Sequence, residues 1–92
     1  MASKFELGTM LATPGALEAL RESNETPQKF FQRHASGDWG EVCPDDWAAN
    51  EAALVNGDRL LSVYRTTLGG EKLWLITEAD RSSSTLLRPG EY

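Results

Sequence analysis

RLLSVYRTTLGGEKLWLITEADRSSSTLL, residues 59–87, is the stretch in which β-branched, aromatic and aliphatic residues cluster most densely between strong turn signals. It contains two strand-like runs, residues 59–68 and 71–78, on either side of Gly69 and Gly70. Glycine adopts the positive φ angles of a tight hairpin turn at no steric cost, so this pair predicts a two-residue loop. The stretch therefore indicates a small antiparallel sheet.

The predicted loop fixes which residues of the two runs face each other. It places Arg65 opposite Trp74, so that guanidinium and indole can stack on one face of the sheet. It also divides the apolar residues between two faces, because side chains alternate along a strand. One face carries Leu61, Val63, Trp74 and Ile76, and the other carries Leu60, Tyr64, Leu73 and Leu75. Apolar residues on both faces predict a strand that is covered on both sides.

Three helices are predicted ahead of the hairpin, each with proline at its first position, where the missing N–H is harmless. Their ranges are about 14–22, about 27–35, and from Pro44 to the stop signal at Asn56-Gly57. The expected fold class is α+β, with about three N-terminal helices packed on one face of a small antiparallel β-meander of two to three strands.

The ends of this arrangement are less regular. Residues 4–11 read either as a short N-terminal edge strand or as an ordered lead-in, and residues 84–87 can return as the third strand. Because the helices cover one face of the sheet, we expect the N-terminal segment or a partner chain to cover the other.

Length and composition indicate one domain spanning residues 1–92. No apolar run approaches the roughly 20 residues of a membrane span, and the first residues lack the pattern of a secretory signal, so we expect a cytoplasmic protein with no membrane contact. A net charge of −5 disfavours nucleic acid as a partner, although a local basic patch stays compatible with it.

The sequence contains no cluster of metal-binding residues. One histidine, His34, and one cysteine, Cys43, have no spaced partner of either kind with which to form a zinc site. The Gly69-Gly70 pair lacks the phosphate-loop pattern and joins two strands. We therefore expect no metal and no cofactor.

Two sets of residues are candidate functional sites. A binding surface would use aromatic and charged residues of the glycine-flanked loop and of the strands. This set is Trp39, Tyr64, Arg65, Asp80 and Arg81. Trp39 is expected to be at least partly exposed in its loop, whereas Trp47 and Trp74 are expected in the core.

The second set would serve an alternative function, the metal-independent hydrolysis of RNA. A base would activate the ribose 2′-hydroxyl, and arginine would stabilise the charge that develops on the phosphate. The candidate residues are His34, Arg65, Glu78, Arg81 and Ser84.

Three runs, TPGALEAL (residues 13–20), SGDWG (36–40) and WLITEADRS (74–82), resemble a family of small bacterial proteins found on plasmids and other mobile elements. Members are labelled plasmid-related or type I restriction subunit, and the resemblance extends through the closing Glu91-Tyr92. This chain has no methyltransferase motif and no room for a catalytic restriction domain, so the second label is not carried over.

A mobile-element setting implies two roles. One is a small acidic protein that binds and blocks a host defence nuclease, of the anti-CRISPR or anti-restriction type. The other is a toxin-like RNase that resembles the barnase and RelE-type group. We expect the first, a non-enzymatic protein-binding module, because the acidic balance and the two-sided apolar strand fit a protein partner better than RNA. The sequence is also compatible with a homodimer.

Overall fold

The computed structural model describes residues 3–92, so that Met1 and Ala2, which the single-domain prediction includes, lie outside the described residues. The helices are α1 (Pro14–Glu22), α2 (Pro27–Ala35) and α3 (Pro44–Asn56). The strands are β1 (Thr9–Ala12), β2 (Leu60–Arg65), β3 (Lys72–Thr77) and β4 (Ser83–Leu87), and a short 3₁₀ helix, η1 (Pro89–Glu91), follows. The α+β prediction is confirmed. In residues 3–92, no helix is both long enough and apolar enough to cross a bilayer.

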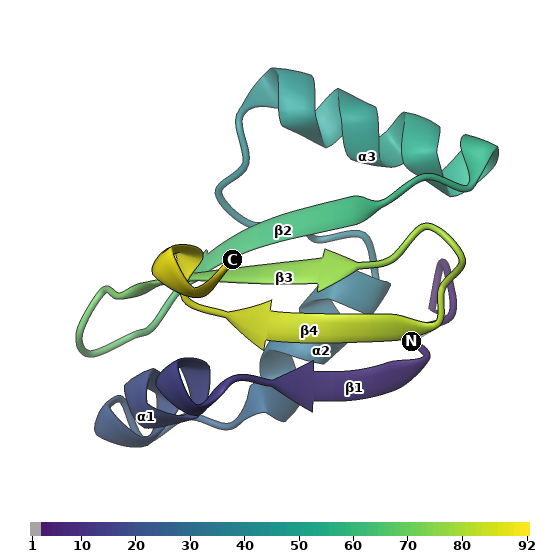
Figure 1. The fold of residues 1–92 in the computed structure, drawn as a ribbon. Helices are drawn as coiled ribbons and strands as arrows, with labels where there is room; N and C mark the ends of the chain where they lie inside the picture. Colours follow the sequence, from purple (N-terminus) through teal and green to yellow (C-terminus); the bar gives the residue numbers. More distant parts are fainter. Residues whose placement is uncertain (1–2) are drawn as a thin grey trace.

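The four strands form one sheet in the order β1-β4-β3-β2 (Figure 1). β2, β3 and β4 form the predicted antiparallel meander, whereas β1 pairs in parallel with β4. The reading of the N-terminal segment as a short edge strand is confirmed by β1. The prediction of a purely antiparallel sheet is corrected, because the parallel pairing of β1 makes the sheet mixed and four-stranded. It occupies one edge of the sheet, and β2 occupies the other.

The loop between β2 and β3 is longer than the predicted two-residue turn. Arg65 faces Lys72, and Trp74 faces Val63, so the predicted pairing of Arg65 with Trp74 is wrong. The backbone N of Thr66 donates to the Glu71 carbonyl at 2.9 Å, and this bond closes the loop. The register differs by two residues, which leaves every side chain on its predicted face because the period of a strand is two. The predicted division of apolar residues between the faces is therefore confirmed.

Glu25, at the junction of α1 and α2, holds this loop in its wider form. Its carboxylate accepts hydrogen bonds from the Thr67 backbone N at 2.7 Å and from Ser23 Oγ at 2.5 Å, and it pairs with Lys29. Burial alone would raise the pKa of Glu25, but the hydrogen bonds from Lys29, Ser23 and Thr67 outweigh burial and lower it to about 2. An ionised carboxylate thus ties the hairpin loop to the helices.

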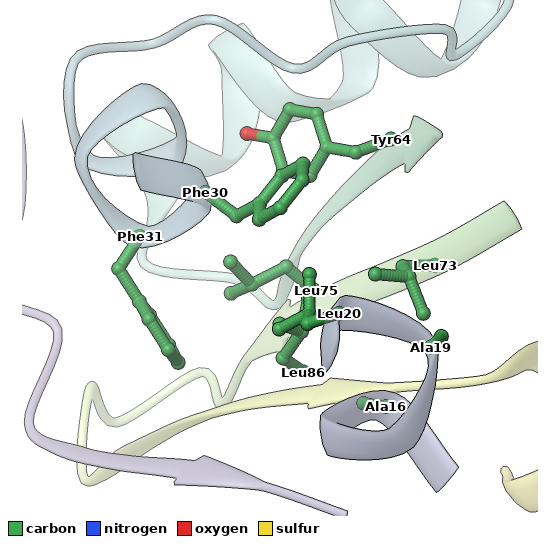
Figure 2. Close-up of a cluster of buried hydrophobic side chains, with 9 residues drawn as sticks. All are labelled: Ala16, Ala19, Leu20, Phe30, Phe31, Tyr64, Leu73, Leu75 and Leu86. Atoms are coloured by element: carbon green, nitrogen blue, oxygen red, sulfur yellow. The ribbon is translucent and has the colours of Figure 1, made fainter. Parts of the chain in front are cut away.

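α1 and α2 pack on one face of the sheet, as predicted, and Figure 1 shows α2 behind the strands. The prediction is wrong for the third helix, because α3 lies along the β2 edge, where its Asn50 side chain bonds to the Leu61 backbone. The Phe30 ring of α2 lies 5.3 Å from the Tyr64 ring of β2, measured between centroids. Each fully buried leucine or phenylalanine side chain contributes about 1.5–3 kcal/mol. Figure 2 shows this core, which comprises Ala16, Ala19, Leu20, Phe30, Phe31, Tyr64, Leu73, Leu75 and Leu86.

The opposite side of the sheet, which we call the open face, faces away from α1 and α2. The C-terminal turn η1 lies in front of it in Figure 1, and the Tyr92 ring packs edge-on against Trp74 at 5.9 Å. The predicted cover by the N-terminal segment is not observed, because that segment continues into β1 at the sheet edge. The open face consists of Thr9, Leu11, Leu61, Val63, Arg65, Lys72, Trp74, Ile76, Ser83, Thr85 and Leu87.

The β2 edge of the sheet is capped by residues of the same chain. The Asn50 side chain of α3 donates to the Leu61 carbonyl at 2.7 Å and accepts from the Leu61 N at 3.1 Å, as a neighbouring strand would. The Val63 N donates to the Trp39 carbonyl at 3.1 Å, and the Val63 carbonyl accepts from the Glu41 N at 2.7 Å. The outward backbone groups of Leu61 and Val63 are thus all paired.

The exposure of the three tryptophan side chains differs from prediction. Trp39 is 0% exposed and Trp47 is 39% exposed, so the expected order is reversed, while Trp74 is half-buried on the open face. Gly37 and Gly40, at φ 90° and 75°, let the loop turn tightly against the sheet. The Trp39 indole N–H then donates to Glu51 at 2.8 Å, which satisfies the one polar group of a buried indole.

The C-terminal turn also caps the first helix. Thr13, the N-cap of α1, accepts from the Ala16 N at 3.1 Å and donates to the Glu91 carboxylate at 2.6 Å. Glu91 accepts a further hydrogen bond from the Gly15 N at 3.2 Å. A carboxylate at a helix N-terminus is stabilised by the helix dipole, so η1 completes the start of α1.

Candidate functional site

His34 is the centre of a buried polar cluster between α2 and the sheet. Its Nδ1 lies 2.5 Å from Ser62 Oγ, and its Nε2 lies 2.9 Å from Thr77 Oγ1. Thr77 Oγ1 lies 2.6 Å from Ser84 Oγ, which donates to the Leu7 carbonyl at 2.8 Å. Three strands thus each contribute a hydroxyl group to one connected chain of hydrogen bonds.

The direction of these hydrogen bonds follows from the end of the chain. The Leu7 carbonyl only accepts, so Ser84 donates to it, Thr77 donates to Ser84, and the Nε2–H of His34 donates to Thr77. A neutral imidazole has one N–H, so Nδ1 accepts from Ser62. Burial, followed by the positive charge of Arg81, lowers the pKa of His34 from 6.5 to about 3. His34 is therefore neutral at pH 7, with its proton on Nε2.

A serine that donates to a histidine has the connectivity of a nucleophile and its base. Here, however, Ser62 and His34 are both 0% exposed. The Phe5 and Trp39 rings lie 5.1 and 5.5 Å from the imidazole and close over it. No substrate reaches either group in this conformation, so the cluster acts as a hydrogen-bonded part of the core.

Of the five residues of the RNase alternative, the structure brings His34 and Ser84 together through Thr77, and both are buried. Arg65 lies opposite Lys72 in the strand pair, at the start of β3, whereas Glu78 follows the end of β3. Six residues of extended strand span roughly 20 Å, so one phosphate cannot contact both Arg65 and Glu78.

Arg81 is held by backbone carbonyl groups. It adopts φ 61°, and its guanidinium donates to the carbonyls of Asp58 at 2.6 Å and Ala53 at 3.1 Å. The guanidinium also lies 5.7 Å from the centre of the Phe5 ring. A cation at the last turn of α3 is favourable for the helix dipole. Arg81 therefore connects α3 to the turn after β3 and has few donors left for a ligand.

The remaining residues of the predicted binding set are spread over the molecule. Trp39 and Tyr64 are buried, and the Tyr64 hydroxyl donates to the Asp38 carbonyl at 2.6 Å. Asp80 is exposed in the turn after β3, where it accepts from the Ser82 N at 3.0 Å. Arg65 is exposed on the open face and pairs with Glu41 at 2.9 Å. Arg65 is thus the member of the predicted binding set that lies on the open face.

That surface, the open face, combines apolar and basic side chains. Leu61, Val63 and Trp74 are half-buried there, in neighbouring positions of β2 and β3. Its charged residues are Arg65 and Lys72, both exposed and both basic, on a chain whose net charge is −5. The excess of carboxylates lies elsewhere, including the exposed surfaces of α1 and α3. The strand positions of the open face therefore carry two basic side chains, of which Arg65 pairs with Glu41, on a protein that is acidic overall.

A groove of about 410 Å³ lies between α2 and the segment that leads into β1. Leu7, Met10 and Phe31 give it an apolar lining, and Gln28 and Gln32 supply amide groups. It contains no charged or nucleophilic cluster, and the described residues include no group of three His, Cys, Asp or Glu side chains that could hold a metal ion. The groove is thus a hydrophobic recess with a polar border rather than a reaction site.

Alternation along the strands could have revealed the buried cluster. Ser62 and Thr77 fall on the same face as Leu60 and Tyr64, so polar groups are expected among buried positions. Such groups need hydrogen-bond partners, and His34, on the aromatic face of its helix, is the natural one.

A scan against protein-family models, a search of curated proteins and a search of solved structures each found no match to this chain.

Proposed function

We propose that this chain is a protein-binding module whose contact surface is the open face. The observation that carries the proposal is the group of half-buried apolar side chains, Leu61, Val63 and Trp74, on a sheet face opposite the packed helices. Apolar side chains gathered on one surface are typical of interaction sites. A partner with an apolar centre would remove them from water.

Charge indicates which kind of protein surface would fit. Lys72 is exposed beside this apolar group, and Arg65 faces it across the strand pair. A partner would therefore carry carboxylates around its apolar centre, and the pairs at the border would orient the complex. The resemblance to mobile-element proteins extends the proposal to one class of partner, a host defence nuclease. That extension rests on the resemblance alone.

Site-specific cross-linking tests the contact surface. A photoreactive amino acid at Lys72 should cross-link a partner in cells, whereas the same group at Arg21, an exposed basic residue of α1, should not. With the partner purified, Lys72→Glu should weaken binding about tenfold, while the matched charge reversal Arg21→Glu leaves the affinity unchanged. Equal loss in both variants would assign the effect to net charge and refute the open face as the contact surface.

The RNase alternative makes a separate prediction. We expect the purified protein to leave RNA intact in EDTA, because the buried neutral His34 cannot reach a ribose hydroxyl. The assay is gel analysis of a labelled RNA, with inspection for a 2′,3′-cyclic phosphate end. EDTA-resistant cleavage that is lost in both His34→Gln and Arg81→Ala would overturn the binding-module proposal in favour of the enzyme.

A further inference from the structure

β1 is an edge strand, and within residues 3–92 no other strand pairs with its outer side. The Thr9 N donates to the Ser82 carbonyl and the Thr13 N donates to the Leu86 carbonyl, both at 3.0 Å. In a parallel ladder alternate residues bond to the same neighbour, so the backbone groups of Met10 and Ala12 point away from β4. β1 ends the sheet on this side. The molecule thus presents a row of outward N–H and C=O groups.

Proteins protect such edges with charged side chains, proline or covering segments, because a free edge pairs readily with another strand. Residues 9–12, Thr-Met-Leu-Ala, contain neither charge nor proline. Met10 is 52% exposed and Leu11 is 48% exposed, one on each face of the strand. The β2 edge, by contrast, is capped by Asn50 and by the segment 39–41. Among the described residues, the β2 edge is thus protected, whereas nothing caps the β1 edge.

We propose that β1 pairs antiparallel with β1 of a second copy of this chain, about a twofold axis at Leu11. The two Leu11 side chains then face each other across the axis as a pair without direct hydrogen bonds. Met10 lies opposite the partner's Ala12, so the outward backbone groups bond to each other, and a large side chain meets a small one. The two sheets become one sheet of eight strands.

A second copy fits this edge better than other occupants for two reasons. The contact closes on itself, because both outer edges of the joined sheet are then the capped β2 edges, and assembly stops at two chains. In addition, the contact strand is uncharged, so two chains that each carry a net charge of −5 meet where neither adds a like charge. Overall repulsion between the chains remains, so added salt should strengthen the dimer by screening.

This proposal goes beyond the proposed function, since it concerns the β1 edge and not the binding of another protein at the open face. Sedimentation of the wild-type protein over roughly a hundredfold range of concentration should show a monomer–dimer equilibrium. Leu11→Lys places two like charges on the twofold axis and should weaken the dimer at least tenfold. Val55→Lys, at an 85%-exposed position of α3, is the matched control and should leave it unchanged.

Disulfide trapping tests the register. In a Cys43→Ser background, Leu11→Cys should yield a cross-linked dimer under mild oxidation, because the two residues are directly opposite. Met10→Cys, similarly exposed but facing the partner's Ala12, should cross-link at least tenfold less. A chain that stays monomeric at every concentration, a dimer indifferent to Leu11→Lys, or equal trapping at both positions would each overturn the proposal. Lys72→Glu, which tests the open face, should leave the dimer intact.

Discussion

Lowering the pH from about 7 to about 4 is expected to reduce the free energy of unfolding by about 3 kcal/mol through His34 alone. Burial lowers the pKa of His34 to about 3 in the folded state, from an ordinary value of 6.5. Between these two values the unfolded chain binds a proton that the folded chain does not. The contribution of His34 to the free energy of unfolding is therefore complete above pH 6.5 and is lost progressively as the pH falls toward 3.

Urea denaturation at several pH values measures this loss, and His34→Gln is the control. A glutamine amide offers an NH₂ group as donor and a carbonyl oxygen as acceptor, so it can keep hydrogen bonds to Thr77 and Ser62 while removing the titration. The variant should lose most of the slope between about pH 7 and about pH 5, which in the wild type amounts to about 2 kcal/mol. An equal slope in both proteins, or an imidazole NMR signal that titrates near its ordinary pKa, would contradict the assignment.

The carboxylates whose pKa values are lowered change the free energy of unfolding in a lower range of pH than His34 does. The folded pKa of Glu25 is about 2, against 4.5 in the unfolded chain, so its contribution is complete above 4.5 and is lost below it. The hydrogen bond and charge of Arg33 outweigh burial and lower the pKa of Asp38 in the same sense. The range above about pH 5 therefore reports mainly on His34, the only histidine of the chain.

Gly40→Ala is expected to destabilise the protein by about 3 kcal/mol or more, which is among the largest effects of a single substitution. Gly40 has φ 75°, and a Cβ there would lie 2.0 Å from the Val63 carbonyl oxygen. To relieve this clash the chain must move away from the β2 edge. The Trp39–Val63 and Glu41–Val63 hydrogen bonds would break, and the buried Trp39 ring would shift with them.

Gly57→Ala provides a matched control for this substitution. Gly57 has φ 76°, almost the same angle, but no heavy atom lies within 4 Å of an added Cβ. Its replacement should cost about 1 kcal/mol, for the backbone conformation alone. For a chain of this size the two variants should differ by roughly 8 °C or more in Tm, and Trp39 should become accessible to acrylamide in Gly40→Ala only. Equal losses in the two variants would show that the close approach to Val63 does not matter.

Local signals predicted the helices well. Pro14, Pro27 and Pro44 each begin a helix in the structure, and Gly57 ends α3 in the left-handed conformation. Both kinds of signal act within a few residues, so neighbouring sequence is sufficient to recognise them. The faces of β2 and β3 were predicted for a related reason, since alternation depends on parity and tolerates a shift of two residues.

Contacts between distant parts of the chain could not be predicted in this way. The parallel pairing of β1 with β4 joins residues near opposite ends of the sequence. The wider hairpin loop depends on Glu25, which is separated from it along the chain by α2, α3 and β2, and the turn signal of Gly69-Gly70 gives no hint of this contact. Long-range pairing of this type is set by the packing of the whole domain.

The site residues were predicted least well. Trp39 was expected at the surface because glycines flank it, but the same glycines allow the loop to fold closely against β2. His34 was predicted as a candidate site residue, whereas its partners Ser62 and Thr77 were not, because a serine or threonine in a strand is common on exposed surfaces as well. The open face was foreseen as apolar, while its basic character follows from the positions of Arg65 and Lys72 in the assembled sheet.

The hydrogen bonds from Thr13 and Gly15 to Glu91 have a consequence for the order in which the chain folds during synthesis. β1 and α1 leave the ribosome first, yet the strand that pairs with β1 and the carboxylate that caps α1 are translated last. The early segments must therefore stay unpaired, or be held by a chaperone, until β4 and η1 have emerged. Because so many contacts join distant residues, folding is expected to be slow for a domain of this size and to wait until β4 and η1 have emerged.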